Sequence, residues 1–203
     1  MGGIQKEGGF FYNLLNNPRV YDPFLRYLGD HDIIQQVIRD ELDLERKKRI
    51  LDIGCGTGNV SRMFPKEHYT GIDSDKNYID FARRKYDKDF ICMSAVDLKF
   101  ENDHFDVIFT KDLFHHLADD LFSKVLAEMK RVLKPTGRVL ILEICYQENN
   151  VSFYKKILNR FDRGKYIREF NVLREMLLVY FKVDKQYLRK GIWADLAVFS
   201  AHK

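Results

Sequence analysis

The sequence predicts an α/β fold in which a mostly parallel sheet is covered by helices on both faces. Short apolar runs typical of buried strands alternate with longer segments whose apolar residues recur at helical spacing. Strands that alternate with helices in this way form right-handed βαβ units, which build a parallel sheet. The length of 203 residues and the apolar content of 45% are enough for one domain with a sizeable core.

The composition excludes several other classes of protein. The 34 Lys and Arg outnumber the 30 Asp and Glu by too little to indicate nucleic-acid binding. No membrane span is expected, since the strongest apolar run, 139–142, stops at Glu143, and the N-terminus resembles neither a signal peptide nor a myristoylation signal. Cys55, Cys92 and Cys145 contain no CxxC pair, which indicates reduced thiols in a cytoplasmic protein.

Residues 1–44 are expected to form an N-terminal arm and a cap helix ahead of the main domain, 45–203. The first half of this segment has no clear period. From Ile33 onward the apolar residues recur at helical spacing, with Asp30 and Asp32 as candidate N-caps.

The main domain contains seven predicted strands separated by helices. Ser74 or Asp75 is expected to cap the second helix, and Pro135 and Gly137 to end the third. The last helical stretch falls between the fifth and sixth strands, so we expect a helical cover insertion at about 146–180. The expected strands are 50–53, 69–72, 90–93, 105–110, 138–144, 181–188 and 194–201, and the expected helices are 57–64, 77–86, 119–133 and most of 151–179.

Three glycines at alternate positions, Gly54, Gly56 and Gly58, directly follow the first predicted strand. Such a loop needs positive φ values and lets the backbone approach a ligand closely, at the sheet edge where doubly wound folds bind ligands. A dinucleotide fingerprint would place its third glycine at Asn59, which disfavours an NAD-dependent oxidoreductase, and no P-loop lysine follows. Asp52 before the glycines suits a cationic amino group better than a pyrophosphate.

The run Asp52–Gly58 resembles motif I of the class I S-adenosylmethionine-dependent methyltransferases of small-molecule type, and the resemblance extends over about 49–203. It implies a Rossmann-like, doubly wound, seven-stranded sheet with the last strand antiparallel and helices on both faces. It also implies that S-adenosyl-L-methionine is the cofactor and that the chain is an enzyme acting on a small-molecule acceptor. The later segments that resemble family motifs are Gly71–Asp73, Ala95–Leu98, Phe105–Ile108 and Leu133–Leu140.

Asp73 ends the second predicted strand, where a carboxylate can accept hydrogen bonds from ribose hydroxyls; capping of the next helix is the alternative. The resemblance implies that Asp97 accepts a hydrogen bond from the adenine amino group, with the backbone of Val96 or Leu98 on the ring. It implies that Asp52 holds the methionine amino group, directly or through water. The full set of expected cofactor-binding residues is Asp52, Gly54, Cys55, Gly56, Gly58, Asn59, Asp73, Ser74, Val96, Asp97, Leu98, Thr110 and Lys111.

His115 and His116, in the loop after the fourth strand, are the candidate catalytic residues. A neutral imidazole near pH 7 accepts a proton from a hydroxyl or amine. The alternative is that they pack and cap the next helix, because methyl transfer often needs only alignment. No metal site is expected, since adjacent histidines lack the spacing of helical ligands. Asp112 would suit the metal-dependent catechol methyltransferases, but 143–145 lacks their Asp-Asn pair.

The acceptor is expected under a lid formed by the N-terminal aromatics and the cover insertion. One or two of the insertion's basic residues would face an anionic group on the acceptor, although a solvated basic face is the other account of these charges. Nucleic acid is disfavoured because 110–113 is no Asn-Pro-Pro-Tyr-like run. An RNA or protein methyltransferase and a non-catalytic partner subunit stay open as alternatives. The candidate acceptor residues are Tyr12, Tyr21, Arg163, Lys165 and Arg168.

Overall fold

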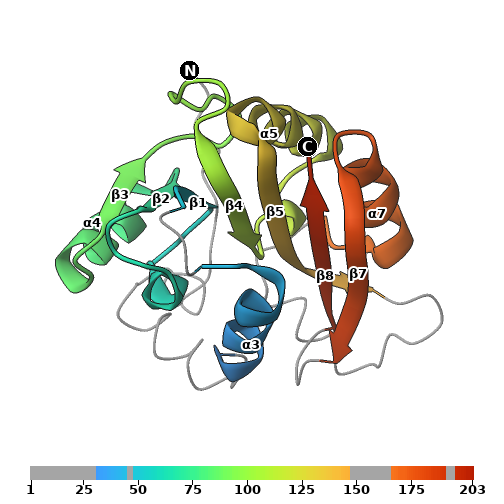
Figure 1. Ribbon diagram of the computed structural model, residues 1–203, viewed down its shortest axis with the longest axis horizontal. Coiled ribbons are helices and arrows are strands. Elements are labelled where there is room, and N and C mark those ends of the chain that lie inside the picture. Colours follow the sequence, from blue (N-terminus) through green and yellow to red (C-terminus); the bar gives the residue numbers. More distant parts are fainter. Residues whose placement is uncertain (1–30, 45–47, 147–165, 191–194) are drawn as a thin grey trace, which may run out of the picture.

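The structure, a computed structural model, describes residues 31–44, 48–146, 166–190 and 195–203. Its described strands form one eight-stranded sheet in the order β3-β2-β1-β4-β5-β8-β7, with β6 paired to β5 off this path (Figure 1). β8 pairs antiparallel with both β5 and β7, and the other described pairs are parallel, which confirms the mostly parallel sheet and the antiparallel last strand. The strands are β1 (Ile50–Ile53), β2 (Tyr69–Asp73), β3 (Asp89–Cys92), β4 (Phe105–Lys111), β5 (Leu133–Tyr146), β6 (Arg168–Glu169), β7 (Lys182–Lys190) and β8 (Asp195–His202).

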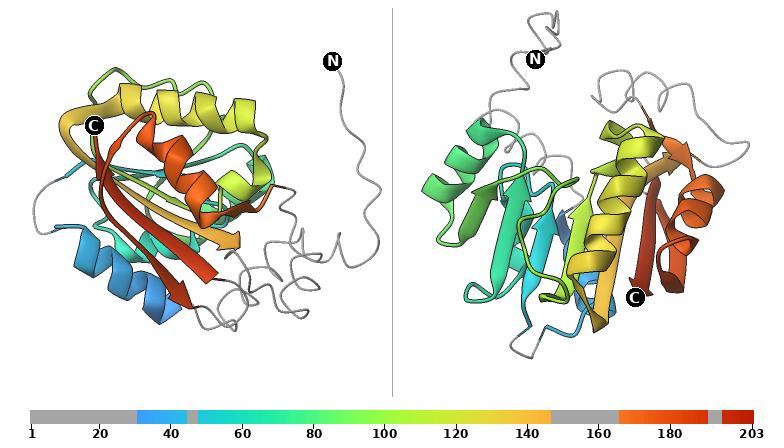
Figure 2. Two further views of the ribbon diagram at one scale, coloured as in Figure 1. Left: turned by 90° about the vertical axis from the view of Figure 1, so that its right-hand side faces the viewer. Right: turned by 90° about the horizontal axis from the view of Figure 1, so that it is seen from above.

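Helices cover both faces of this sheet, as predicted. Helix α3 (His31–Glu41), the 3-10 turn η1 (Asn59–Met63) and α4 (Lys76–Lys85) pack on one face. Helices α5 (Asp119–Val132) and α7 (Phe170–Leu178) pack on the other, and Figure 2 shows α3 on the opposite side of the sheet from α5 and α7. None of the helices in the described part of the chain is long and apolar enough to cross a lipid bilayer.

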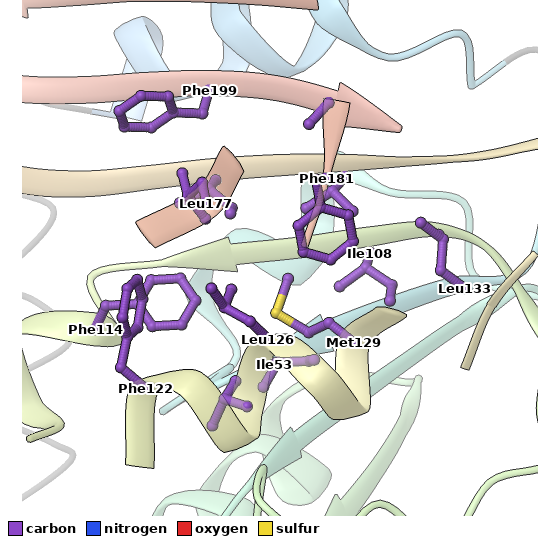
Figure 3. Packing of buried hydrophobic residues seen from close by; sticks show 14 of the residues in the cluster. Ile53, Ile108, Phe114, Phe122, Leu126, Met129, Leu133, Leu177, Phe181 and Phe199 are labelled. Atoms are coloured by element: carbon purple, nitrogen blue, oxygen red, sulfur yellow. The ribbon is translucent and has the colours of Figure 1, made fainter. Parts of the chain in front are cut away.

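The core between the sheet and α5 also holds the start of the loop that follows β4 (Figure 3). Phe114, in the 3-10 turn η2 (Phe114–His116), is fully buried. Its ring meets that of Phe122 edge to face, with centroids 4.2 Å apart. Burying a side chain of this size contributes about 1.5–3 kcal/mol, so packing anchors η2 to α5.

Two predicted helices differ from the observed elements. The helix expected at 57–64 is only the 3-10 turn η1, which begins after Gly58 with no side-chain cap. The helix expected at 119–133 ends at Val132, and β5 begins at the next residue, so the expected stop signals Pro135 and Gly137 lie inside the strand. They occupy an irregularity in the β4–β5 register, where proline and glycine are tolerated.

The expected cover insertion is described only at its end. Residues 147–165, and with them most of the expected helical stretch, lie outside the described residues. Beyond them the chain forms the two-residue strand β6, which is the eighth strand and was not predicted, and then α7. In the N-terminal segment, α3 confirms the helix expected from Ile33 onward, and residues 1–30 lie outside the described part.

Candidate active site

The glycine loop follows β1 at the carboxyl edge of the sheet. Gly54, Gly56 and Gly58 have φ values of 76°, 55° and 75°, so the predicted need for positive φ is confirmed. The N–H groups of Gly54 and Cys55 donate to the carbonyl of Ile72 in β2, at 2.8 and 2.9 Å. Among the described residues, no heavy atom beyond the two chain neighbours lies within 4 Å of the point where a Cβ on Gly56 would stand, so the middle of the loop is open to a ligand.

Asp73, at the carboxyl end of β2, braces this loop. Its Oδ2 accepts a hydrogen bond from the Gly56 N–H at 2.9 Å, and its Oδ1 accepts one from the Asp75 N–H at 2.8 Å. Burial raises the pKa of the Asp73 carboxyl, and the two backbone donors oppose that rise. Asp75 caps α4 by accepting from the N–H groups of Asn77 and Tyr78, so capping does not account for Asp73.

Asp52, on β1, is buried below the glycine loop. Its Oδ2 accepts a hydrogen bond from the Tyr69 hydroxyl at 2.6 Å. Burial raises the pKa of the Asp52 carboxyl from 3.8 to about 7, against the opposing effect of the Tyr69 hydrogen bond. A nearby ammonium group favours the ionised form of such a carboxyl, so Asp52 is suited to a cationic ligand group.

On the side of the site expected to bind adenine, after β3, the structure differs from the prediction at Leu98. The Leu98 N–H donates to Glu128 Oε2 at 2.7 Å and the Leu98 side chain is buried, so this backbone donor is already used within the protein. Asp97 is exposed, and its Oδ2 accepts from Lys99 Nζ at 2.6 Å. Of the two backbone positions expected against adenine, the structure therefore leaves Val96, which is half-buried.

The other expected cofactor residues gather at the same edge. Thr110 pairs with Ile53 in register at the end of β4, and the Lys111 ammonium contacts the Asp112 carboxylate. Ser74 is exposed after β2. Asn59 opens η1 directly after the glycine loop.

The turn η2 brings a histidine and a carboxylate together. His115 is buried, and its Nδ1 lies 2.5 Å from Glu143 Oε1 on β5. The other oxygen, Glu143 Oε2, accepts from the Phe114 N–H at 2.6 Å. His116 is exposed, with its ring centroid 4.0 Å from that of His115. Sequence reasoning missed Glu143, although an acidic residue inside an otherwise apolar strand was the available signal.

The loop that carries His115 and His116 contacts the glycine loop. Leu113, directly before η2, has its Cδ1 3.0 Å from the point where a Cβ on Gly54 would stand. A side chain at Gly54 would therefore press on Leu113, which would have to shift by a few tenths of an ångström. The close packing places the His115 turn next to the first glycine, on the same edge of the sheet as Asp52.

The contacts of Arg168 contradict its predicted role, which was to bind an anionic group of the methyl acceptor. Its Nε and both Nη groups donate to the Asp119 carboxylate and to three backbone carbonyls. The N–H groups of the guanidinium are thus engaged within the protein. The other four expected acceptor residues, Tyr12, Tyr21, Arg163 and Lys165, lie outside the described residues.

Known methyltransferases are similar to this chain. A methyltransferase domain family matches residues 50–137. A demethylmenaquinone methyltransferase from Thermotoga maritima is 29% identical over an alignment of 174 positions, which covers 74% of this chain and 75% of that protein. A phthiotriol/phenolphthiotriol dimycocerosates methyltransferase from Mycobacterium ulcerans is 33% identical over 48% of this chain and 38% of that protein. A solved S-adenosylmethionine-dependent methyltransferase from Methanosarcina mazei superposes with a TM-score of 0.68 at 22% identity, covering 82% of this chain and 96% of that one.

The matched domain, the relatives and the shared fold support a class I S-adenosylmethionine-dependent methyltransferase. They support S-adenosylmethionine as its cofactor. The site of this methyltransferase fits that molecule on its own chemistry. An open backbone at Gly56 allows close approach, and the carboxyls of Asp73 and Asp52 suit hydroxyl and ammonium groups respectively.

Three side chains of the methyltransferase offer atoms of the kind that bind metals. Asp112, His115 and Glu143 each place one such atom within 4.8 Å of the others. The Lys111 ammonium already contacts the Asp112 carboxylate, and both oxygens of Glu143 accept hydrogen bonds. A metal cation beside the Lys111 ammonium would be repelled. The charges therefore favour the hydrogen bonds and the ion pair that Glu143 and Asp112 already make over binding of a metal ion.

Proposed function

We propose that this methyltransferase acts on a small-molecule acceptor and that His115 takes up the proton the acceptor loses. The observation that carries the proposal is the 2.5 Å contact between His115 Nδ1 and Glu143 Oε1, on a turn whose preceding residue, Leu113, packs against Gly54. A partnered imidazole next to the cofactor loop is suited to general-base catalysis.

The residues of the cofactor site have separate roles in this proposal. Asp73 binds the ribose hydroxyls while it holds the Gly56 N–H. Asp52 attracts the amino group of the methionine part, and Asp97 accepts from the adenine amino group. When bound, S-adenosylmethionine supplies a sulfonium methyl group that accepts a lone pair from the acceptor, while the carbon–sulfur bond breaks and its electron pair stays on sulfur.

Glu143 determines which nitrogen of His115 is basic. A carboxylate at Glu143 accepts the Nδ1 proton, which leaves the imidazole lone pair on Nε2. The same carboxylate stabilises the imidazolium that forms when Nε2 takes a proton from a hydroxyl or amine of the acceptor. Alignment of the acceptor and exclusion of water supply the rest of the rate enhancement, of which alignment gives about 7–11 kcal/mol in favourable cases.

The choice of a small molecule is supported by the relatives. The curated proteins similar to this chain are named for demethylmenaquinone, for phthiotriol dimycocerosates and for a fatty acid. The first of these comparisons spans three quarters of both chains, whereas the other two cover less than two fifths of the relative. Small apolar molecules with an acidic or hydroxyl group are therefore the acceptors to test first.

A labelling experiment tests the proposal. The purified protein is incubated with methyl-tritiated S-adenosylmethionine and, in separate reactions, a short-tailed demethylmenaquinol, a long-chain fatty acid, total tRNA and a bulk protein extract. We expect label in the organic-solvent extract of one of the first two reactions. Label confined to RNA or protein contradicts the small-molecule proposal. Bound cofactor without any transfer supports a non-catalytic subunit instead.

A further inference from the structure

Arg168 ties three elements together around the turn that carries the histidines. Its Nη1 donates to the carbonyl of Phe114 at 2.9 Å and its Nη2 to that of Leu117 at 2.7 Å, which lie at the two ends of η2. Its Nε and Nη2 both reach Asp119 Oδ1, at 3.0 and 2.5 Å, on the first residue of α5. One side chain on β6 thus holds both ends of η2 and the start of the next helix.

The main chain beside Arg168 adds a direct bond to the histidine. The Tyr166 N–H donates to the His115 carbonyl at 2.9 Å. Arg168 itself is paired with Cys145 on β5, two residues after Glu143. Strand β5 therefore supports two restraints on His115: Glu143 holds the imidazole, and β6 holds the backbone.

The turn is closed by two backbone hydrogen bonds, from the His116 N–H to the Leu113 carbonyl at 3.1 Å and from the Leu117 N–H to the Phe114 carbonyl at 3.0 Å, and the bonds from outside add to these. Leu113, at the N-terminus of η2, makes no side-chain cap bond. Asp112, just before it, has a φ of 53°, which is unfavourable for a residue other than glycine. Ala118 at the N-terminus of α5 also lacks a side-chain cap. A 3-10 turn has poorer hydrogen-bond geometry than an α-helix, so the groups that bind it from outside help to hold its shape.

We propose that Arg168 is a positioning residue for methyl transfer, which sets the orientation of His115 against Glu143 by holding the η2 carbonyls. The inference rests on the role proposed above for His115. A planar guanidinium is suited to the task because its fixed fork of donors serves a carboxylate and several carbonyls at once. A lysine at this position keeps the charge but cannot hold the same set of acceptors.

Arg131 provides a matched control on another loop. Its guanidinium donates to Glu128 and to the carbonyls of Leu98 and Phe100. It thus braces the segment before β4 with a similar network and makes none of these bonds to η2. The variant Arg131→Lys loses a comparable set of hydrogen bonds, so it reports the effect of general destabilisation.

The test compares Arg168→Lys with Arg131→Lys in the full chain, saturated with S-adenosylhomocysteine. The tautomer and the pKa of His115 are read from nitrogen–proton NMR spectra, assigned with His115→Ala. We expect Arg168→Lys to change both properties of His115, while Arg131→Lys leaves them at the wild-type values. With the acceptor labelled in the experiment above, Arg168→Lys should lower kcat by about 10–100-fold, with KM and S-adenosylhomocysteine affinity changed by less.

The outcomes separate this inference from the proposed function. If Arg168→Lys leaves the His115 spectrum and kcat unchanged, or if Arg131→Lys changes the His115 spectrum equally, Arg168 does not position His115. If His115→Ala transfers methyl groups at the normal rate, the role of His115 fails, whatever the spectra of the Arg168 variant show. If Arg168→Lys does not fold, Asp119→Asn serves instead, because it removes the charged partner of the Arg168 guanidinium and keeps the hydrogen bonds to the carbonyls. We then expect a smaller change in the His115 spectrum and in kcat.

Discussion

The Tyr69 hydroxyl donates a 2.6 Å hydrogen bond to the Asp52 carboxylate, across the neighbouring strands β2 and β1. Both side chains are buried under the glycine loop. Burial raises the pKa of the Asp52 carboxyl to about 7, so the charge state of the group below the cofactor loop changes near neutral pH. Stability and cofactor binding should both respond to that change.

The first prediction concerns stability. Asp52 in the folded chain keeps its proton up to about pH 7, whereas in the unfolded chain it loses it near pH 4. The folded state therefore binds more protons between these values, and the contribution of Asp52 to the free energy of unfolding is lost as pH rises through 7. The free energy of unfolding of Asp52→Asn minus that of the wild type should therefore increase from pH 5 to pH 8, by on the order of 3 kcal/mol. Urea unfolding at the two pH values measures this, and parallel pH curves for both proteins would contradict it.

The second prediction concerns cofactor affinity. If Asp52 attracts the amino group of the methionine part, S-adenosylmethionine binds the ionised form better, and its affinity rises as pH increases from 6 to 8. Calorimetry should show this rise in the wild type and a much flatter dependence in Asp52→Asn. Asp80→Asn, which changes a surface carboxylate paired with Lys76 on α4, is the control and should keep the wild-type slope. An unchanged slope in Asp52→Asn would assign the ammonium to another group.

Asp73 gives the third prediction. Its two oxygens accept from Gly56 and Asp75, so the carboxylate supports the loop as well as the ribose hydroxyls it is proposed to bind. Asp73→Ala should weaken S-adenosylmethionine binding by about 1.5–3 kcal/mol, the value of hydrogen bonds to a charged group. Calorimetry measures the loss. Equal affinity in mutant and wild type would exclude the ribose role.

The fourth prediction separates the two histidines. His115→Ala should lower kcat by about 10²–10⁴-fold with little change in S-adenosylmethionine affinity, because a general base acts only on the reacting proton. His116→Ala is the matched control: its ring is exposed, whereas the Glu143 carboxylate contacts the ring of His115, and we expect near-normal turnover. Glu143→Gln should fall between the two. Normal turnover in His115→Ala would mean that alignment alone drives the reaction.

The features that sequence predicted correctly have local causes. The positive φ values of the glycine loop follow from glycine itself. Asp75 was expected as a candidate cap from its place before a helical period, and it is the cap of α4. The antiparallel last strand and the order of the elements followed from the family resemblance together with the alternation of patterns.

The features that sequence could not predict depend on which strands become neighbours. Glu143 meets His115 because β4 and β5 are paired in register. Leu98 loses its N–H to Glu128 through a contact between distant segments. Arg168 was expected to face an anionic group of the acceptor, because the sequence does not show that it binds the carbonyls of Phe114 and Leu117, about fifty residues earlier in the chain. Short-range periodicity contains no information on such pairs.

The last prediction compares two glycines of the same loop. Gly56 and Gly58 both have positive φ values, so alanine at either position costs about 1–2 kcal/mol in backbone strain. Their surroundings differ: within the described part of the chain, an added Cβ on Gly56 has no heavy atom within 4 Å apart from its chain neighbours, whereas one on Gly58 would stand 2.8 Å from the Phe90 ring. Phe90 is buried in the core, where it contacts Tyr69 edge to face, so it has little room to move away.

Gly58→Ala should therefore be the less stable variant, since steric overlap with a packed core adds typically 1–3 kcal/mol to the strain. Gly56→Ala should unfold at a temperature nearer to that of the wild type. Relative to its loss of stability, however, it should lose more affinity for S-adenosylmethionine than Gly58→Ala does, because its methyl group occupies the open side of the loop. Thermal unfolding and calorimetry on the two variants measure both quantities. If Gly56→Ala binds the cofactor as tightly as the wild type, the cofactor does not approach the loop at Gly56. If instead the two variants unfold at the same temperature, Phe90 yields to the added methyl group and the core under the loop is softer than its packing indicates.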